Sequence, residues 1–359
     1  MLLFNFSRAR QFITAILLLL LISGIITVAI LVPLLIKFRS EANAQPSTIP
    51  VLRWKSNGIT VAGVTGSSGD ANYQFNQPKK AAWQRPNILY IADYQNNRIQ
   101  RYEIGSSNGT TISGNGSFGL ASNELYYPAY VTIASNDGIV IADRYNNRVQ
   151  LWFNGNTTGT TIAGTGVSGS ALNQLHYPTG LAYDSNSSIL YIADYSNDRV
   201  MRYVSGVLNG TVVAGGNGFG TNYTQLWRPA GLYFDSFSNS LIIASTNVHA
   251  IVQWPLDASN WALTAGCVGI SGHNATLLSY PQDVTLDPMG NVYVADTNNH
   301  RIQLFMNGQT EAVTIAGTTS ISGNNDTLLN GPFGITLDNQ LNLYVADTGN
   351  HRIQQFLRY

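Results

Sequence analysis

The chain has 359 residues, and its 19 Lys and Arg balance its 19 Asp and Glu. Only 11% of its residues are charged, against about 25% in a typical soluble domain, and no excess of positive charge marks it as a nucleic-acid-binding protein. The single Cys267 excludes a disulfide within the chain.

The first feature along the chain is an uncharged run over residues 11–36, rich in Leu, Ile and Val. A helix that rises ~1.5 Å per residue over this run is long enough to cross a hydrocarbon core of about 30 Å. A cleaved signal peptide is the alternative, because residues 42–44 offer an A-x-A site, but the run is much longer than a signal core. We therefore expect a cytoplasmic tail at 1–10, an uncleaved transmembrane signal-anchor at 11–37 and a stalk at 38–57.

The flanking basic residues do not orient this anchor, since two Arg precede it and Lys37 and Arg39 follow it. The rest of the chain is poor in charge and rich in Asn, Ser, Thr and Gly, which favours an extracellular or luminal position. It carries eight N-x-S/T sequons, about the number that such an Asn-rich chain contains by chance. The candidate glycosylation sites are Asn108, Asn115, Asn156, Asn186, Asn209, Asn222, Asn274 and Asn325.

After the stalk, one twelve-residue phrase is repeated six times at steps of 50 or 51 residues. Its first copy reads LYIADYQNNRIQ, and a second phrase, T-[IV]-A-G or a relative, recurs with the same step. A fixed period of this length indicates a repeat architecture. The copies of the first phrase begin at Leu89, Ile139, Leu190, Leu241, Val292 and Leu343, and the second phrase ends at Gly63, Gly114, Gly164, Gly215, Gly266 and Gly317.

Each unit predicts four short strands, which is typical of a propeller blade. LYIAD and RIQ form a hairpin around an Asn-rich turn, TIAG supplies an outer strand, and a segment such as 177–184 supplies the inner strand. The first TVAG precedes the first LYIAD, and no TVAG follows the last one, so one blade is split between the two ends of the repeat region. We expect Ile59–Gly63 to pair with Arg352–Phe356 and close a ring over 58–359, which hides aggregation-prone edges.

The D-x-x-N-x-R-[IV]-Q phrase, with Asn-His-Arg in its last two copies, resembles the NHL repeat over about residues 59–359. The resemblance implies a six-bladed β-propeller. The expected fold class is therefore an all-β NHL propeller, preceded by one transmembrane helix. Families with this repeat include extracellular sensor and scaffold propellers, zinc-dependent peptidyl-amidoglycolate lyases and RNA-binding propellers.

Among these classes we expect a membrane-anchored extracellular binding or scaffold module, without enzymatic activity or a cofactor. It would recognise a protein, peptide or glycan partner through one face. A zinc-dependent lyase is the alternative, but it needs three convergent His ligands, and outside the repeat phrase only His176, His249 and His273 remain. We expect no metal site and no nucleic-acid partner, since the chain from Gln45 onward has 15 Lys and Arg against 18 Asp and Glu.

Five copies of the repeat phrase place an Asp at the end of the second strand and an Arg five residues later. A hairpin can join such a carboxylate and guanidinium as a structural pair. The fourth copy lacks both, with Ser245 and Ala250 instead, as expected if a lone buried charge is costly. The turn Asn residues should bond their own backbone, and His300 and His351 should be satisfied turn residues. The predicted pairs are Asp93–Arg98, Asp143–Arg148, Asp194–Arg199, Asp296–Arg301 and Asp347–Arg352.

Departures from the repeat indicate the binding site. When the six inner strands are aligned on their Pro, one position is Gly in three copies but Lys80, Tyr130 and Asp283 in the others. We interpret these side chains as polar groups exposed at the rim of one channel mouth, with Lys79 and His176 nearby. The prediction is that Lys80, Tyr130, Asp283 and His176 contact a ligand that lies across the opening.

Overall fold

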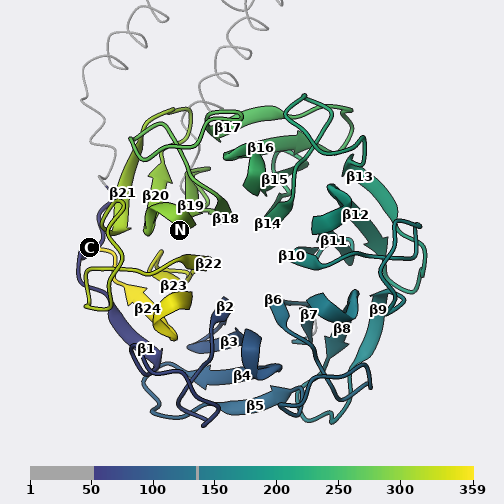
Figure 1. Ribbon diagram of the computed structural model, residues 1–359, viewed down its shortest axis with the longest axis horizontal. Coiled ribbons are helices and arrows are strands. Elements are labelled where there is room, and N and C mark those ends of the chain that lie inside the picture. Colours follow the sequence, from purple (N-terminus) through teal and green to yellow (C-terminus); the bar gives the residue numbers. More distant parts are fainter. Residues whose placement is uncertain (1–51, 135–136) are drawn as a thin grey trace, which may run out of the picture. The chain divides into compact units, whose positions relative to one another are not determined.

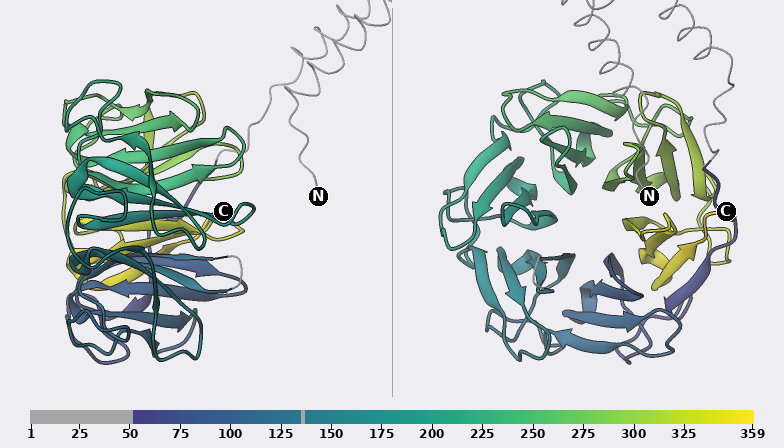
Figure 2. Two further views of the ribbon diagram at one scale, coloured as in Figure 1. Left: turned by 90° about the vertical axis from the view of Figure 1, so that its right-hand side faces the viewer. Right: turned by 180° about the vertical axis from the view of Figure 1, so that it is seen from behind.

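The computed structural model describes residues 52–134 and 137–359, which form six four-stranded antiparallel sheets. The sheets stand around a central axis as the blades of a closed ring (Figure 1), and seen from the side the ring is a disc (Figure 2). The predicted six-bladed propeller is therefore confirmed. The predicted tail and anchor and most of the stalk lie outside the described residues. Within residues 52–134 and 137–359, no helix is long and apolar enough to cross a membrane.

Every blade runs from an inner strand at the axis to an outer strand at the rim. The inner strands are β2 (Pro78–Gln84), β6 (Pro128–Ile133), β10 (Pro178–Asp184), β14 (Pro229–Asp235), β18 (Pro281–Leu286) and β22 (Pro332–Leu337). The second strands are β3 (Ile88–Asp93), β7 (Ile139–Asp143), β11 (Ile189–Asp194), β15 (Ser240–Ser245), β19 (Val292–Asp296) and β23 (Leu343–Asp347). The third strands are β4 (Arg98–Glu103), β8 (Arg148–Trp152), β12 (Arg199–Val204), β16 (Ala250–Pro255), β20 (Arg301–Phe305) and β24 (Arg352–Phe356).

The outer strands are β1 (Ile59–Gly63), β5 (Thr110–Ser113), β9 (Thr160–Gly164), β13 (Thr211–Gly215), β17 (Ala262–Gly266) and β21 (Ala312–Gly317). A single turn of 3-10 helix joins the second strand to the third in each blade: η1 (Tyr94–Asn96), η2 (Arg144–Asn146), η3 (Tyr195–Asn197), η4 (Thr246–Val248), η5 (Thr297–Asn299) and η6 (Thr348–Asn350). We number the blades 1 to 6 by their inner strands, from β2 to β22.

Blade 6 takes its outer strand from the start of the repeat region. β1 pairs antiparallel with β24, with Ile59 opposite Gln355 and Gly63 opposite Arg352. Figure 1 shows this join where the two ends of the colour scale meet. The predicted closure is confirmed, and the edge of β24 is covered as in the other blades.

The second strands form the core because each blade is stacked between two others. All six residues of β3 are buried, and so are all five of β19. A strand that is covered on both faces is a continuous apolar run, not an alternating one. The aromatic residues at or next to the ends of the third strands are also buried: Tyr102, Trp152, Tyr203, Trp254, Phe305 and Phe356.

Candidate functional site

The Asp–Arg pairs are structural, and all five predicted pairs are present. In each one the Arg Nε donates to the Asp Oδ2 at 2.7–2.8 Å, and the Asp side chain has no exposed surface. Arg98 also donates to the backbone carbonyls of Asp70, Ala71 and Gln74. The pair therefore fastens the loop that leads into the inner strand. In blade 4 the hydroxyl of Ser245 serves instead, accepting from the Trp227 backbone N–H at 3.2 Å.

The turn residues bond neighbouring groups and not, as predicted, chiefly their own backbone. Asn197 donates to Asp194 Oδ2 and to the Gly169 carbonyl, both at 2.8 Å. The residue that directly follows each 3-10 turn has a left-handed backbone conformation. Its side chain accepts a hydrogen bond from a backbone N–H group of the following blade. Asn97 accepts from Tyr127 at 3.0 Å in this way. The prediction is wrong because the Asn side chains occupy two different turn positions.

His300 and His351 occupy this same linking position. His300 Nδ1 accepts from the Gly331 N–H at 3.0 Å, and His351 Nδ1 accepts from the Gln77 N–H at 3.1 Å. They are satisfied turn residues, as expected. One such bond joins each blade to the next; the accepting residues are Asn97, Asn147, Asp198, His249, His300 and His351.

Lys80, Tyr130 and Asp283 meet at the axis. Lys80 Nζ donates to Asp283 Oδ2 at 2.6 Å, and the Tyr130 hydroxyl donates to Asp283 Oδ1 at 3.0 Å. Lys80 Nζ also donates to the Ile335 carbonyl at 2.6 Å, and the Ile335 N–H donates back to Asp283 Oδ2 at 2.9 Å. We call Lys80, Tyr130 and Asp283 the channel plug, because they join blades 1, 2 and 5 to blade 6 across the ring.

The expectation that these three side chains are exposed at a rim is wrong. Lys80 is 7% exposed, Tyr130 4% and Asp283 0%. Burial, together with the adjacent Asp283, raises the pKa of Tyr130 well above its ordinary value. The cause is a β-bulge between each Pro and the third strand residue, as at Pro78/Lys80. A bulge re-aims a side chain, and here it turns the side chains inward.

Glycine at the equivalent position allows close approach of the strands. A Cβ added to Gly231 would lie 2.3 Å from Asp283 Oδ1, and one added to Gly334 would lie 2.4 Å from the Lys79 carbonyl oxygen. The inner strands with Gly at this position therefore pack closely against the plug and leave no open space beside it.

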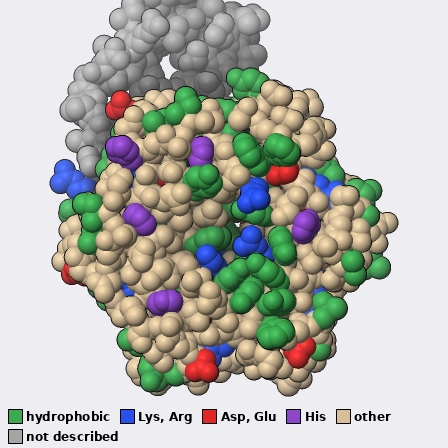
Figure 3. Space-filling model, in the orientation of Figure 1, with side chains coloured by type: hydrophobic (Ala, Val, Ile, Leu, Met, Phe, Trp, Pro, Cys, Tyr) green, Lys and Arg blue, Asp and Glu red, His purple; other side chains and the backbone are tan. Residues whose placement is uncertain are grey.

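One face of the ring carries the turns η1 to η6 and the loops into the inner strands. Figure 3 views one face of the ring, on which hydrophobic side chains gather beside Lys and Arg near the centre and His side chains lie farther out. Ring contacts run across three blades: Tyr94 stacks on Tyr127 at 4.8 Å, Tyr127 meets Tyr145 at 5.0 Å, and Tyr145 meets Tyr177 at 4.9 Å. Tyr126 contacts both Tyr127 and Tyr145. We call these five tyrosines the aromatic arc.

Cations lie against the arc and its neighbours. Lys79 Nζ is 4.2 Å from the ring centre of Phe333 and 5.4 Å from that of Tyr94. The Arg144 guanidinium carbon is 5.0 Å from the ring centre of Tyr195 and 5.7 Å from that of Tyr177. At these distances a cation is attracted by the face of a ring.

The third cation is Arg228, whose guanidinium carbon is 5.5 Å from the ring centre of Tyr195. We call the surface formed by the aromatic arc and these three cations the mouth, and Lys79, Arg144 and Arg228 the mouth cations. Among the described residues, none of them is within ion-pair distance of a carboxylate. Arg144 Nε is buried and has no hydrogen-bond partner. Burial, followed by the charge of Arg144, lowers the pKa of Lys79 to about 8.

His176 lies beside the arc, with its ring centre 4.8 Å from that of Tyr177. Its backbone N–H donates to Asp194 Oδ1 at 2.6 Å. Arg144 and Arg228 were missed by the sequence analysis, although both interrupt the repeat. Arg144 stands where other blades have Tyr or Thr after the Asp, and Arg228 stands where most have Tyr, Gln or Gly before the Pro.

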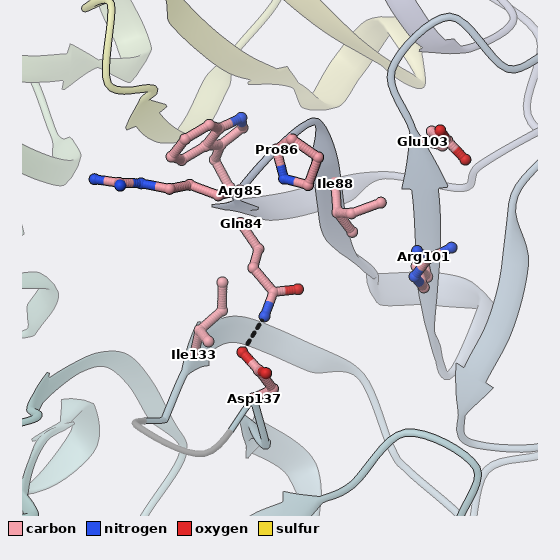
Figure 4. A pocket seen from close by; sticks show the side chains of 9 residues that line it. Gln84, Arg85, Pro86, Ile88, Arg101, Glu103, Ile133 and Asp137 are labelled. Carbon is pink, nitrogen blue, oxygen red and sulfur yellow. Dashed lines mark hydrogen bonds between the residues drawn. The ribbon is translucent and has the colours of Figure 1, made fainter.

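The other end of the inner strands carries a separate cleft between blades 1 and 2, with a volume of about 730 Å³. Gln84 Nε2 donates across it to Asp137 Oδ1 at 2.6 Å (Figure 4). Its charges are mixed, because Arg85 and Arg101 share the walls with Glu103 and Asp137. This cleft is far less uniform in chemistry than the opposite mouth, so we take the mouth as the candidate site.

The structure also locates the other predicted candidates. His249 Nδ1 already accepts from the Tyr280 N–H at 3.2 Å, and within residues 52–134 and 137–359 no three His, Cys, Asp or Glu side chains form a metal-ligand group. All eight sequon Asn residues, from Asn108 to Asn325, are exposed.

The comparisons with known proteins agree with this architecture. The model of the NHL repeat matches residues 125–151, 278–305 and 329–356. NHL repeat-containing protein 2 of Bos taurus is 39% identical over 90 residues, which cover 23% of this chain. The matched part spans only 12% of that relative's length.

Solved structures show the same fold at low identity. An auxiliary nutrient binding protein from Bacteroides ovatus superposes with a TM-score of 0.62 at 14% identity, over 86% of this chain and 77% of its own. A gluconolactonase from Xanthomonas campestris superposes with a TM-score of 0.60 at 12% identity, over 84% and 97%. At such identities a shared fold implies no shared activity. The chain is a six-bladed β-propeller that carries NHL repeats.

Proposed function

We propose that this protein is a membrane-anchored extracellular binding module that captures its ligand at the mouth formed by the aromatic arc and the mouth cations. The observation that carries the proposal is the continuous run of ring contacts across blades 1, 2 and 3, above a buried plug. Aromatic side chains give large contact areas at low entropic cost and are enriched at binding surfaces. The similarity to an auxiliary nutrient binding protein supports a binding role.

The chemistry of the mouth favours binding over catalysis. A catalytic site needs a nucleophile or a general acid and base free to reach the reacting atoms. At the centre of this propeller the carboxylate of Asp283 is already engaged by three donors. The Nδ1 atoms of His300 and His351 are occupied by backbone N–H groups. What the mouth offers a ligand is ring faces and cations.

The proposed location rests on the uncharged run at 11–36, which is long enough to span a bilayer, and on the low charge of the propeller that follows it. The protein should remain in the membrane fraction after carbonate washing. Protease added outside intact cells should digest the propeller, and a glycosidase should reduce the apparent mass. A propeller that is protected in intact cells would contradict the extracellular orientation.

The mouth is tested with a matched pair of aromatic substitutions. Tyr145 in the arc is 38% exposed, and Phe153 at the opposite end of β8 is 37% exposed. The full-length protein would be screened against arrays of glycans and peptides, and each hit measured with both variants. Tyr145→Ala should weaken capture at least tenfold, a loss of about 1.4 kcal/mol, whereas Phe153→Ala should leave it unchanged. The reverse pattern would place binding on the other face.

A further inference from the structure

We infer that the ligand of the mouth is an acidic oligosaccharide, whose carboxylate or sulfate groups bind the mouth cations while its sugar rings pack on the aromatic arc. This inference rests on the proposed function, since it names the chemical class that the same surface would take.

The first support is an unbalanced charge. Lys79 and Arg144 both lie against ring faces without a carboxylate at ion-pair distance in the described part of the chain. Arg228 is nearer to balance, because its charge interacts with that of Asp198, whose Oδ1 also accepts the Arg228 backbone N–H at 2.7 Å. By contrast, the five repeat arginines and Lys80 each have a buried Asp partner. The chain therefore pairs its buried structural cations and leaves those of the mouth for an external anion.

The second support is the state of Arg144. Tyr177 and Tyr195 flank its guanidinium, which limits the orientations of that planar group. Its Nε is buried without a partner. A buried donor that makes no hydrogen bond costs about 1–3 kcal/mol, and a guanidinium presents its N–H groups as a fork that fits a carboxylate or sulfate. An acid group bound to the terminal N–H groups of this guanidinium would balance its charge.

Lys79 gives a third and independent indication. Its ammonium group is largely shielded from water between Phe333 and Tyr94, and Arg144 repels it. These effects lower the pKa of Lys79 to about 8, so its charged form is less favoured here than on a lysine in water. A bound anion would reverse this by favouring the charged form. The groups that face Lys79 are Arg144, Tyr94 and Phe333, and none of them is an acid.

The aromatic arc supplies the remaining contacts. Tyr145 presents 38% of its surface to solvent, and the stacking of Tyr94 on Tyr127 beside it fixes the rings of the arc in place. The C–H face of a pyranose is apolar and packs on such rings, while its hydroxyl groups reach the tyrosine hydroxyls. Because sugar rings are stiff, their ordering on the arc loses less conformational entropy than that of a flexible peptide.

An acidic saccharide also fits the spacing of charge better than a nucleic acid does. Nucleic acid carries a phosphate on every nucleotide and is bound by a continuous basic groove. Here, three cations are separated by rings, and the chain from Gln45 onward carries more acidic than basic residues. A saccharide with an acid group on only some of its rings matches this sparse pattern.

The test uses the full-length protein and a hexamer of galacturonic acid. Its fully methyl-esterified form is the neutral match, and a sulfated galactose hexamer separates sulfate from carboxylate. Hexaglutamate and a six-nucleotide RNA represent the other ligand classes. Binding would be measured by calorimetry for the parent, for Lys79→Gln/Arg144→Gln and for the opposite-face control Arg85→Gln/Arg101→Gln. Thermal unfolding of each variant would show that it is folded.

We expect at least one acidic hexamer to bind, with at least tenfold loss in Lys79→Gln/Arg144→Gln and no loss in the control. If that hexamer is galacturonic acid, methyl esterification should also weaken binding at least tenfold, and binding unchanged in Lys79→Gln/Arg144→Gln would overturn the inference. Arg144→Lys should bind the acidic hexamer more tightly than Arg144→Gln and more weakly than the parent. Lysine keeps the positive charge but lacks the planar fork of N–H groups. Equal binding of the esterified hexamer would overturn the inference but leave the proposed function standing. Binding of only hexaglutamate or RNA, or of none of the probes, would also overturn it, and the Tyr145 and Phe153 screen would then decide the proposed function separately.

Discussion

Replacing Asp283 by Ala should destabilise the propeller by about 3–5 kcal/mol, the range measured when one partner of a buried ion pair is removed. Asp283 has no exposed surface and accepts hydrogen bonds from Lys80 Nζ at 2.6 Å, the Tyr130 hydroxyl at 3.0 Å and the Ile335 N–H at 2.9 Å. Truncation leaves a buried ammonium without its counter-ion, which sets the magnitude. It also leaves two neutral donors, each worth about 1–3 kcal/mol if unsatisfied, and these terms overlap because the groups are in contact.

Urea and thermal unfolding of purified protein would measure the effect. At roughly 2 °C per kcal/mol for a domain of this size, the melting temperature should fall by about 6–10 °C. Lys80→Met with Asp283→Leu is the matched variant, since removing both charges avoids the unpaired ammonium and is often close to neutral. If Asp283→Ala were within about 1 kcal/mol of the parent, water would have to reach Lys80, and the plug would not be the desolvated cluster described above.

Asp194→Ala and Arg199→Ala should couple by about 0.5–3 kcal/mol in a double-mutant cycle, because Arg199 Nε lies 2.7 Å from Asp194 Oδ2; purely additive losses would show that this contact carries no energy. Removing residues 53–63 strips the outer strand from blade 6, so light scattering should detect aggregation through the freed edge, and a truncated chain as soluble and stable as the parent would contradict that role. Lys79→Met should raise the melting temperature at pH 7, because the parent holds a disfavoured charge there. This advantage should shrink as the pH rises through about 8, where folded Lys79 loses its proton before the unfolded chain does. Tyr94, whose pKa is raised to about 12 by burial, stays neutral across this window; a constant difference from pH 7 to 10 would mean that the pKa is unshifted.

The repeated phrases, together with the split of one copy between the two ends of the repeat region, were enough to predict the fold. LYIAD and RIQ specify local hairpins, the step of 50 or 51 residues specifies the blades, and the split copy specifies the closure. The Asp–Arg pairs were predictable for the same reason, because partners five residues apart in one hairpin must meet. These features depend on neighbours along the chain, which a sequence displays directly.

The site depends on contacts that a sequence does not display. Lys80 and Asp283 are 203 residues apart and meet only because their strands converge at the axis. Their inward direction follows from the bulges after Pro78 and Pro281, which an alignment of the inner strands on their Pro does not display. Arg144 interrupts the repeat visibly, but its contacts with one ring from a turn and one ring from a loop of blade 3 follow only from the stacking of the blades.

The antiparallel pairing of β1 with β24 also sets the order of events during synthesis. β1 leaves the ribosome about 290 residues before its partner, which at about 5–20 residues per second is an interval of roughly 15–60 s. Through that interval β1 has no strand to pair with, although Ala62 can already pack against residues of blade 1 such as Phe75, and five blades are already available to form. The ring can be completed only when Arg352–Phe356 emerges. A premature stop upstream of Arg352 would thus leave β1 unpaired, with an exposed strand edge of the kind that promotes aggregation.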